Sequence, residues 1–472
     1  MKTLMKEIRR RSMVALHYAV MVVAFVACWV VFYRREAIQG LFFTRSVVVC
    51  TAYIALLLVL DKVYNVYKVG WVSVSELVYS QTLANLISLC ITYFLASLLA
   101  KKMLRIVPGT ILMIGQFVWS MIWTILANKQ YFRLYEPKKA VIIYRNEKDL
   151  EKLKEVHYIT NRWKIDKVVQ WDGSKDYFLQ DNQGKTDEEE IHQLMEIMRD
   201  YEVVFVSGIA ATLRNGIAKY CVDANKECYF VPHTGDIITA GAEHMRTMAV
   251  PICCIKRSMP SPEYLFIKRL IDVVASATAI VILSPFMLLT AALIKVYDHG
   301  PVLYKQVRLT KDGKRFEILK FRSMKVDAEK DGVARLASEN DDRITPVGKV
   351  IRAIRFDELP QLFNILRGDM TIVGPRPERP EIAAQYEEDL PAFSLRLQVK
   401  AGLTGYAQVY GRYNTEPQDK LKMDLMYINH MCLSEDFKLI FATIRILFLK
   451  DSTQGIEAGQ TTAAQVKNEK SA

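Results

Sequence analysis

Residues 352–377 read R-A-I-R-F-D-E-L-P-Q-L-F-N-I-L-R-G-D-M-T-I-V-G-P-R-P, and the organisation of the rest of the chain follows from this stretch. Two adjacent carboxylates, Asp357 and Glu358, stand directly before an apolar series. The i, i+3, i+4, i+7 spacing of that series predicts one face of a helix, formed by Leu359, Leu362, Phe363 and Leu366. Pro360 suits the first turn of such a helix, and Gly368 suits its C-terminal cap.

The carboxylate pair is therefore expected at a helix N-terminus. Backbone N–H groups and the helix dipole favour phosphate there and keep a carboxylate ionised. Arg352 and Arg355 precede the pair, and Arg376 follows it in a Gly-Pro-Arg-Pro turn. An Asp-Glu pair by itself is an ordinary helix cap. The arginines on both sides favour a phosphate-handling site instead.

The motif F-D-E-L-P-Q-L-F-N-I-L-R-G-D-M-T-I-V-G-P-R-P resembles the signature of the bacterial sugar transferases, also called polyprenyl-phosphate phosphoglycosyl transferases. The resemblance extends over residues 264–450 and includes K-R-L-I-D-V, L-K-F-R-S-M and V-K-A-G-L-T-G-Y-A-Q-V-Y-G-R. It implies a membrane enzyme that moves a sugar 1-phosphate from a UDP-sugar onto undecaprenyl phosphate and releases UMP. Arg355-Phe356 departs from the family pattern, in which a small hydroxyl residue and an aliphatic one are common.

The resemblance also implies roles for the two carboxylates. Asp357 would be the covalent nucleophile, and Asp357 and Glu358 would hold Mg²⁺. An aspartate is ionised at neutral pH, because its reference pKa is about 3.9, and it needs no general base. The diphosphate of the donor requires charge neutralisation by the metal and by basic side chains. Candidates for phosphate and nucleotide contact are Lys268, Arg269, Lys320, Arg322, Arg352, Arg355 and Arg376.

The composition is that of a membrane protein that handles anions. Of 472 residues, 51% are hydrophobic, and the net charge is +12. Such a charge suits a surface that lies against anionic lipid and binds anionic substrates. Nucleic acid is not an expected partner, because the basic residues flank apolar segments instead of forming one stripe. The eight cysteines show no metal-ligand spacing, which argues against a zinc site or a disulfide framework.

Four apolar runs follow a basic leader, and each is near the roughly 20 residues that cross a bilayer. They are residues 13–33, 41–60, 82–100 and 106–127. Residues 1–130 are therefore predicted to form a four-helix transmembrane bundle with its N-terminus in the cytoplasm. The bundle is expected to serve as a membrane anchor or as a homodimer interface. The expected location is the bacterial inner membrane, with the active site facing the cytoplasm.

Residues 138–250 are predicted to form a Rossmann-like α/β domain. Strands are expected at residues 140–144, 165–171, 203–207 and 227–231, and helices at 147–156, 187–201 and 209–225. This alternation predicts a parallel sheet. The first strand leads into Arg145-Asn146-Glu147 with no G-x-G-x-x-G, so a dinucleotide site lacks its phosphate cradle. A structural or regulatory domain is the favoured interpretation.

A fifth apolar run, residues 273–294, is long enough to span a membrane. A spanning helix would place Asp357 on the opposite side from the α/β domain. Ser284 and Pro285 interrupt the run, where proline removes a helix hydrogen bond and serine can satisfy the freed group. Together with the family resemblance, this break predicts a re-entrant helix over residues 268–297 that returns to the face it entered.

The fold class expected is thus a membrane protein, α plus α/β, with a monotopic catalytic domain over residues 264–450. Within that domain the patterns predict strands at 301–307 and 314–321, helical pieces at 381–388 and 393–400, and a tight turn at 401–405. A final helix carries an apolar face that suits the membrane interface or the protein core equally: Phe437, Ile440, Phe441, Ile444, Leu447 and Phe448. Residues 339–343 are a solvated turn or a metal-binding loop, and residues 451–472 are expected to be disordered.

The expected activity would initiate synthesis of exopolysaccharide, capsule or O-antigen. Two other functions stay open on the sequence alone. One is a conventional membrane glycosyltransferase that moves only the sugar and releases UDP. The other is a non-enzymatic scaffold of polysaccharide assembly. Neither the sugar nor the ligand of the α/β domain can be read from the residues.

Overall fold

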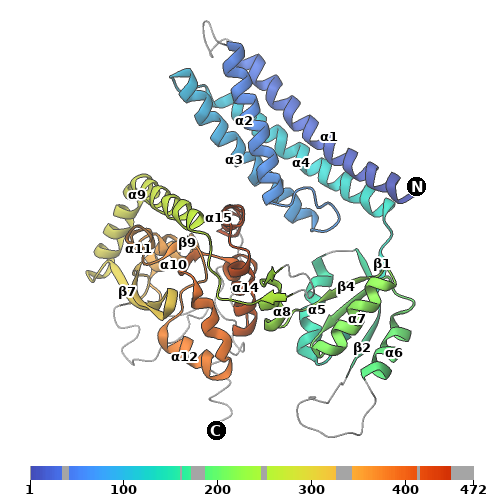
Figure 1. The fold of residues 1–472 in the computed structure, drawn as a ribbon. Coiled ribbons are helices and arrows are strands. Elements are labelled where there is room, and N and C mark those ends of the chain that lie inside the picture. The colour runs from blue at the N-terminus through green and yellow to red at the C-terminus, as the bar shows by residue number, and fades with distance from the viewer. Residues whose placement is uncertain are drawn as a thin grey trace. The chain divides into compact units, whose positions relative to one another are not determined.

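A computed structural model of the chain describes residues 2–33, 42–159, 162–171, 187–245, 252–325, 343–411 and 415–447 (Figure 1). The chain separates into two compact units, Met1–Val231 and Pro232–Ala472. The first unit holds the N-terminal helices and the α/β domain. The second unit holds the dyad Asp357-Glu358.

The four N-terminal apolar runs are helices, as predicted. They are α1 (Lys2–Cys28), which continues into a π-helical turn η1 (Trp29–Tyr33), α2 (Phe42–Val63), α3 (Val74–Ala100) and α4 (Ile106–Leu134). Helix α3 starts well before the predicted residue 82, because the Ser73 hydroxyl caps it by accepting a hydrogen bond from Glu76 N. With α9 below, the described residues contain five helices that are long and apolar enough to cross a membrane.

The interior of the N-terminal helices combines apolar and polar contacts. The rings of Phe25 and Tyr53 stack with their centroids 3.9 Å apart. Gln116 Nε2 donates to the Tyr53 hydroxyl at 2.8 Å and to Met21 O at 3.3 Å. Asp61, near the end of α2, is also buried. These contacts hold α1, α2 and α4 together through side-chain hydrogen bonds as well as apolar packing.

The α/β domain has the predicted parallel sheet. Its strands are β1 (Lys138–Tyr144), β2 (Trp163–Gln170), β3 (Val203–Ser207) and β4 (Glu227–Phe230), in the order β2-β1-β3-β4. Its helices are α5 (Glu147–Ile159), α6 (Asp187–Met198) and α7 (Ala211–Asp223). In the turn before α5, Asn146 Oδ1 accepts a hydrogen bond from Asp149 N, and Asp149 Oδ1 accepts one from the Ser207 hydroxyl at 3.4 Å. This helix N-terminus is thus occupied by the chain's own polar side chains.

The second unit begins before residue 250, where the sequence had placed the end of the α/β domain. It opens with α8 (Thr234–Ala240) and a hairpin of β5 (Glu243–Met245) and β6 (Ile252–Cys254). Ile237 of α8 packs in one core cluster with Leu421 and Leu425 of α14 (Pro417–Asn429). Asn429 Nδ2 also donates to Ile237 O at 2.6 Å. Helix α8 therefore packs with the part of the chain that carries the dyad.

Helix α9 (Pro262–Asp298) contains Pro285 and bends along its length (Figure 1). Before the proline, Asp272 accepts hydrogen bonds from Thr371 Oγ1 at 2.7 Å and from Ile372 N at 3.0 Å. After the proline, Met287 and Ile294 pack in one core cluster with Phe321 and Ile351. Both limbs of α9 thus lie against the same unit.

The remaining elements of this unit surround the dyad. The antiparallel pair β7 (Leu303–Leu309) and β8 (Arg315–Phe321), joined by the turn η2 (Lys311–Gly313), confirms the predicted hairpin. After it come α10 (Pro346–Ala353), the 3-10 turn η3 (Phe356–Glu358), α11 (Gln361–Arg367), β9 (Thr371–Val373), α12 (Pro380–Asp389) and the 3-10 segment η4 (Pro391–Gln398). The unit ends with β10 (Gly402–Thr404), α13 (Tyr406–Tyr410), α14 and α15 (Leu433–Leu447).

The predicted tight turn at residues 401–405 is wrong, because this segment contains strand β10, which pairs in parallel with β9. Its glycines serve backbone packing. A Cβ atom on Gly402 would lie 2.1 Å from Gly374 N, and one on Gly405 would lie 2.3 Å from Gly374 O. Gly402 N in turn donates to Pro375 O at 2.8 Å. The Gly-Pro-Arg-Pro turn is therefore seated directly on the backbone of residues 402–405.

The final helix differs in part from its prediction. Leu439, which lies outside the predicted apolar face, is buried in the core cluster with Leu425, whereas Phe437 is 43% exposed. Ile440 lies partly buried against the same cluster. Helix α15 thus packs on the core through one face and exposes Phe437 on another. The predicted polar loop at 339–343, apart from Arg343, and the tail at 451–472 lie outside the described residues.

Candidate functional site

The dyad lies in the 3-10 turn η3, between α10 and α11, and not in the first turn of one continuous helix. Arg355 before it has the left-handed φ of +58°, which turns the chain sharply out of α10. Helix α11 then runs from Gln361 to Arg367. Gly368 follows as its C-cap, and its φ of +92° and its amide bonds to Asn364 O and Ile365 O confirm the predicted cap. The carboxylates are thus presented on a short turn immediately ahead of the helix.

The predicted apolar face of α11 is only partly correct. Leu362 and Ile365 are buried, but Phe363 is 38% exposed. The buried polar residue Asn364 takes part of the expected apolar face, since its Nδ2 donates to Glu317 O at 2.8 Å and its Oδ1 accepts from Leu319 N at 3.0 Å. These two bonds fix the rotation of α11 against β8 and so fix the turn that carries the dyad.

Glu358 is held by two cations. Its Oε1 accepts hydrogen bonds from Lys320 Nζ at 2.9 Å and from Arg376 Nη2 at 3.2 Å. Burial alone would raise the pKa of this carboxyl, but Lys320 and Arg376 outweigh it and hold the pKa well below its usual range. Glu358 is therefore a fixed anion that joins β8, η3 and the Gly-Pro-Arg-Pro turn.

Asp357 has a different environment. Its pKa is raised, first by burial and then by the neighbouring charge of Glu358, while Lys320, Arg352 and Arg355 act in the opposite direction. Among the described residues, no side chain donates a hydrogen bond to its carboxylate. One member of the dyad is thus clamped, and the other is available to a substrate within reach of several positive charges.

The structure brings most of the predicted cations to the dyad. Lys320 and Arg376 contact Glu358 directly, and the charges of Arg352 and Arg355 act on Asp357. Arg322 instead packs against Gly300, just after α9. A Cβ atom added to Gly300 would lie 2.1 Å from Arg322 Nη1.

Lys268 and Arg269 are engaged elsewhere, contrary to their prediction as phosphate ligands. Lys268 Nζ pairs with Asp436 Oδ2 at 2.7 Å in a buried site. Arg269 donates to Ile365 O at 2.6 Å and Leu366 O at 2.7 Å, which places it at the end of α11 that is remote from the dyad. A buried ammonium needs a carboxylate, and helix C-terminal carbonyls attract a guanidinium, so both groups are satisfied by the fold.

Sequence reasoning missed the residues that fix the Gly-Pro-Arg-Pro turn. Arg308 Nη1 donates to Pro377 O at 3.0 Å, and Arg396 Nη2 donates to Arg376 O at 2.8 Å. Arg396 also pairs with Asp424 Oδ2 at 2.7 Å. These partners belong to four separate segments of the chain, so no local sequence motif predicts their contacts.

A divalent cation would have two carboxylates at this site. Within the described part of the chain, no group of three or more His, Cys, Asp or Glu side chains could hold a metal ion. Mg²⁺ is commonly bound by one or two protein carboxylates, with substrate phosphates and water completing the shell. Asp357 has no side-chain donor among the described residues, and only Oε1 of Glu358 is bound by Lys320 and Arg376. The donor set therefore fits a metal that arrives with a phosphorylated substrate.

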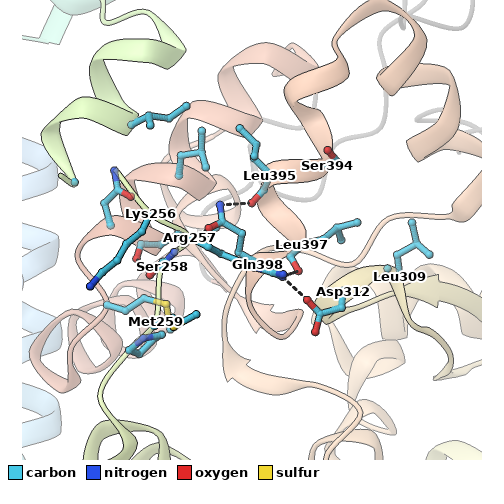
Figure 2. Close-up of a pocket in the computed structure, with 18 of the residues that line it drawn as sticks. Lys256, Arg257, Ser258, Met259, Leu309, Asp312, Ser394, Leu395, Leu397 and Gln398 are labelled. Carbon is cyan, nitrogen blue, oxygen red and sulfur yellow. Dashed lines mark hydrogen bonds and ion pairs between the residues drawn. The ribbon is translucent and has the colours of Figure 1, made fainter. Parts of the chain in front are cut away.

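A cavity of about 1170 Å³ lies elsewhere in the second unit, between the segment before α9 and the elements η4 and α14 (Figure 2). Arg257 pairs with Asp312 there, and Ser258 N donates to Gln398 Oε1 at 3.0 Å. Neither Asp357 nor Glu358 lines it. The cavity is thus separate from the dyad, and its ion pair is internal to the protein.

The region of the chain that contains the dyad is also the region that matches known proteins. The family model described as bacterial sugar transferase matches residues 263–450. An N-acetylgalactosaminephosphotransferase of Aeromonas hydrophila, named for UDP-N-acetylgalactosamine and undecaprenyl phosphate, is 44% identical over 40% of this chain and 45% of its own length. A UDP-glucose:undecaprenyl-phosphate glucose-1-phosphate transferase of Klebsiella pneumoniae is 37% identical over 46% of this chain and 48% of its own.

A shorter relative is covered almost completely. The exopolysaccharide production protein of Rhizobium leguminosarum bv. phaseoli is 38% identical over 38% of this chain and 94% of its own length. The chain thus matches about half the length of the longer relatives and nearly all of this one. In each case the match covers no more than about half of this chain.

Proposed function

We propose that this chain, which belongs to the bacterial sugar transferase family, transfers a sugar 1-phosphate from a UDP-sugar to undecaprenyl phosphate and releases UMP. The observation that carries the proposal is the contrast within the dyad. Glu358 is clamped by Lys320 and Arg376, whereas Asp357 stays available among cations. The relatives named for this transfer support it. The product would initiate exopolysaccharide, capsule or O-antigen synthesis.

Asp357 acts as the nucleophile in this proposal. Its carboxylate oxygen attacks the phosphorus that carries the sugar, and the bond to the bridging oxygen breaks, so that UMP leaves with that oxygen and the electron pair. An oxygen of undecaprenyl phosphate then attacks the same phosphorus and releases the Asp357 carboxylate. No proton must be moved in either step, because carboxylate and lipid phosphate are both largely ionised at neutral pH. The raised pKa of Asp357 makes its carboxylate more basic than an exposed aspartate.

Asp357 and Glu358 would hold Mg²⁺, which supplies neutralisation of the diphosphate charge when bound. Lys320 and Arg376 keep Glu358 ionised and fix its orientation. Arg352 and Arg355 add positive charge on the side of Asp357. These groups stabilise the charge that gathers on the phosphoryl oxygens during transfer.

Helix α9 would enter the membrane, bend at Ser284-Pro285 and return to the same face. Both of its limbs pack on the unit that carries the dyad, as the Asp272 bonds and the Met287 and Ile294 contacts indicate. Large apolar side chains on both limbs are exposed, including Phe266, Val281 and Leu288. A helix so arranged places the dyad beside the headgroups, where undecaprenyl phosphate presents its phosphate.

In the proposed topology the site would lie on the cytoplasmic face of the bacterial inner membrane, where it would meet the UDP-sugar. The four N-terminal helices would anchor the chain there. The same helices would also form the interface of a homodimer.

The deciding experiment identifies the nucleotide that is released. Purified full-length protein receives Mg²⁺, undecaprenyl phosphate and a panel of UDP-sugars, with Asp357→Asn measured in parallel. UMP released from one donor and lost in the variant is the expected result, and it also names the sugar. Release of UDP would establish sugar transfer without phosphate instead. No nucleotide from any donor would favour a scaffold of polysaccharide assembly.

A further inference from the structure

We propose that Lys420 binds the phosphate that leaves with the nucleotide, as part of a cationic subsite it forms with Arg308 and Arg376. The inference rests on the proposed function, and it assigns a residue outside the dyad and outside the motif around it. It also states which part of the donor that residue recognises.

The subsite is built on the Gly-Pro-Arg-Pro turn. Arg376 reaches from this turn to Glu358 of the dyad at 3.2 Å. Arg396 holds the turn from behind, through Arg376 O at 2.8 Å, and is itself fixed by Asp424 of α14 at 2.7 Å. The turn is thus tied at one end to the dyad and at the other to α14.

Lys420 lies on α14 one turn before Asp424. Residues four apart share a face of a helix, so Lys420 lies on the face that meets this turn. Its charge interacts with those of Arg376, Arg396, Glu378 and Asp424. The row of cations that starts at Lys320 and Arg376 therefore continues to Lys420.

Within the described residues, the ammonium of Lys420 has no hydrogen-bond or ion-pair partner, although the residue is half-buried. Lys422, two residues on, pairs with Asp419 at 3.2 Å. Nearby, Arg308 Nε is buried and also lacks a hydrogen-bond partner in that part of the chain. Glu378 pairs with Arg396 at 3.5 Å and with Arg308 at 4.0 Å, but it leaves Arg308 Nε without a hydrogen bond. Buried donors are normally satisfied, so this open Nε and the unpaired ammonium of Lys420 indicate an anionic ligand in addition to Glu378.

Burial and neighbouring charges give the same indication. Burial lowers the pKa of Lys420 below its usual value, and Arg396 and Arg376 lower it further, whereas Glu378 and Asp424 act in the opposite direction. Burial likewise lowers the pKa of Arg308 to about 10; Glu378 raises it, and Arg376 and Arg379 lower it further. A phosphate dianion bound between these groups would relieve the repulsion among them.

The position favours the nucleotide over the lipid phosphate. Helix α9 lies along one side of this unit, and α12 lies on the opposite side (Figure 1). Glu378, whose charge interacts with Lys420, stands just before α12. The subsite thus extends from the dyad toward α12 and away from α9. A diphosphate whose sugar-bearing phosphorus meets Asp357 would place its second phosphate there.

The test measures binding and kinetics on the full-length protein. Three variants are compared: Lys420→Met, Lys420→Arg and Lys314→Met, the last removing an exposed lysine in the turn between β7 and β8. We expect Lys420→Met to raise the KM for the UDP-sugar and the Kd for UMP by about ten- to a hundredfold, because it removes one charge-assisted contact. The KM for undecaprenyl phosphate stays unchanged. Lys420→Arg retains most of the affinity, and Lys314→Met behaves as the parent protein.

An unchanged Kd for UMP in Lys420→Met would overturn the inference, and so would a rise confined to the KM for undecaprenyl phosphate. The binding measurement needs no turnover. If the parent protein released no UMP, the proposed function would fail while the UMP affinities still decided the role of Lys420. Thermal unfolding of each variant controls for loss of structure, and Lys420→Gln, which also removes the charge but keeps a polar side chain, is measured in its place if the methionine variant unfolds.

Discussion

The Ser284 hydroxyl donates a hydrogen bond of 2.8 Å to the carbonyl of Val281. Val281 stands four residues before Pro285, which has no N–H, so this carbonyl would otherwise lose its helical donor. In lipid such a group has no water to replace the bond. The serine therefore makes the proline tolerable inside an apolar helix.

Replacing both residues removes the reason for the bend. We expect α9 of Ser284→Ala/Pro285→Ala to be an uninterrupted helix that favours a straight path through the bilayer. The dyad would then no longer lie at the membrane face where the substrates meet, and the rate of transfer should fall at least tenfold. Accessibility of a cysteine placed at Lys314 to a membrane-impermeant thiol reagent, in vesicles of known orientation, measures the topology. An activity and a labelling pattern equal to those of the parent would contradict the role of this break. Ser284→Ala alone is the matched control and should keep the bend.

The second prediction concerns the buried pair of Lys268 and Asp436. Tyr264 and Tyr427 complete the site by donating to Asp436 at 2.7 Å and 2.8 Å. Lys268→Met leaves a buried carboxylate without its cation, and we expect it to cost about 3–5 kcal/mol in the free energy of unfolding. Thermal unfolding in detergent shows this as a lowered Tm, and Lys268→Met/Asp436→Leu should recover part of the loss. If Lys268 bound phosphate instead, the single variant would keep its Tm and raise the KM for a substrate.

Much of the fold could be predicted from local sequence patterns. The strands of the α/β sheet, the hairpin of β7 and β8 and the cap at Gly368 were predicted because alternation, turn residues and glycine act over a few residues. The dyad was found for the same reason, since its carboxylates and Arg376 belong to one short stretch.

The side chains that were predicted wrongly or missed are those whose partners lie far away in the sequence. In the sequence, Lys268 is a cation beside an apolar run, as a residue that binds phosphate would be. Its partner Asp436 is distant in the chain, and only the fold brings the two together. Asn364 interrupts the expected apolar face of α11 because β8 offers it two backbone partners. Lys420 gave no signal at all, since its role depends on a turn formed by residues 374–377. Side-chain pairing across the fold is not encoded in periodicity.

The third prediction tests the backbone contact beneath the Gly-Pro-Arg-Pro turn. In Gly402→Ala the added Cβ would lie 2.1 Å from Gly374 N, so strand β10 must separate from the turn that carries Arg376. We expect a loss of about 1–3 kcal/mol in stability, as for other overpacked sites, together with a loss of transfer activity. Gly235→Ala is the control, because its added Cβ would meet no atom of the described residues within 4 Å apart from its own helix backbone and chain neighbours. Equal melting temperatures for the two variants would show that the contact is not tight.

The fourth prediction is the pH dependence of nucleotide release. The nucleophile must be ionised, so the rate of the first step falls as pH decreases through the pKa of Asp357, which burial and Glu358 raise above the ordinary value. Glu358→Gln removes the neighbouring negative charge and frees Lys320 and Arg376 to act on Asp357, and both changes lower its pKa. We therefore expect the acid limb of the profile to move to lower pH in this variant, although its maximal rate is reduced. Single-turnover release of UMP across an acidic pH series measures the limb. A limb that moved to higher pH, or that did not move, would mean that the two carboxylates do not interact as their adjacent positions on η3 require.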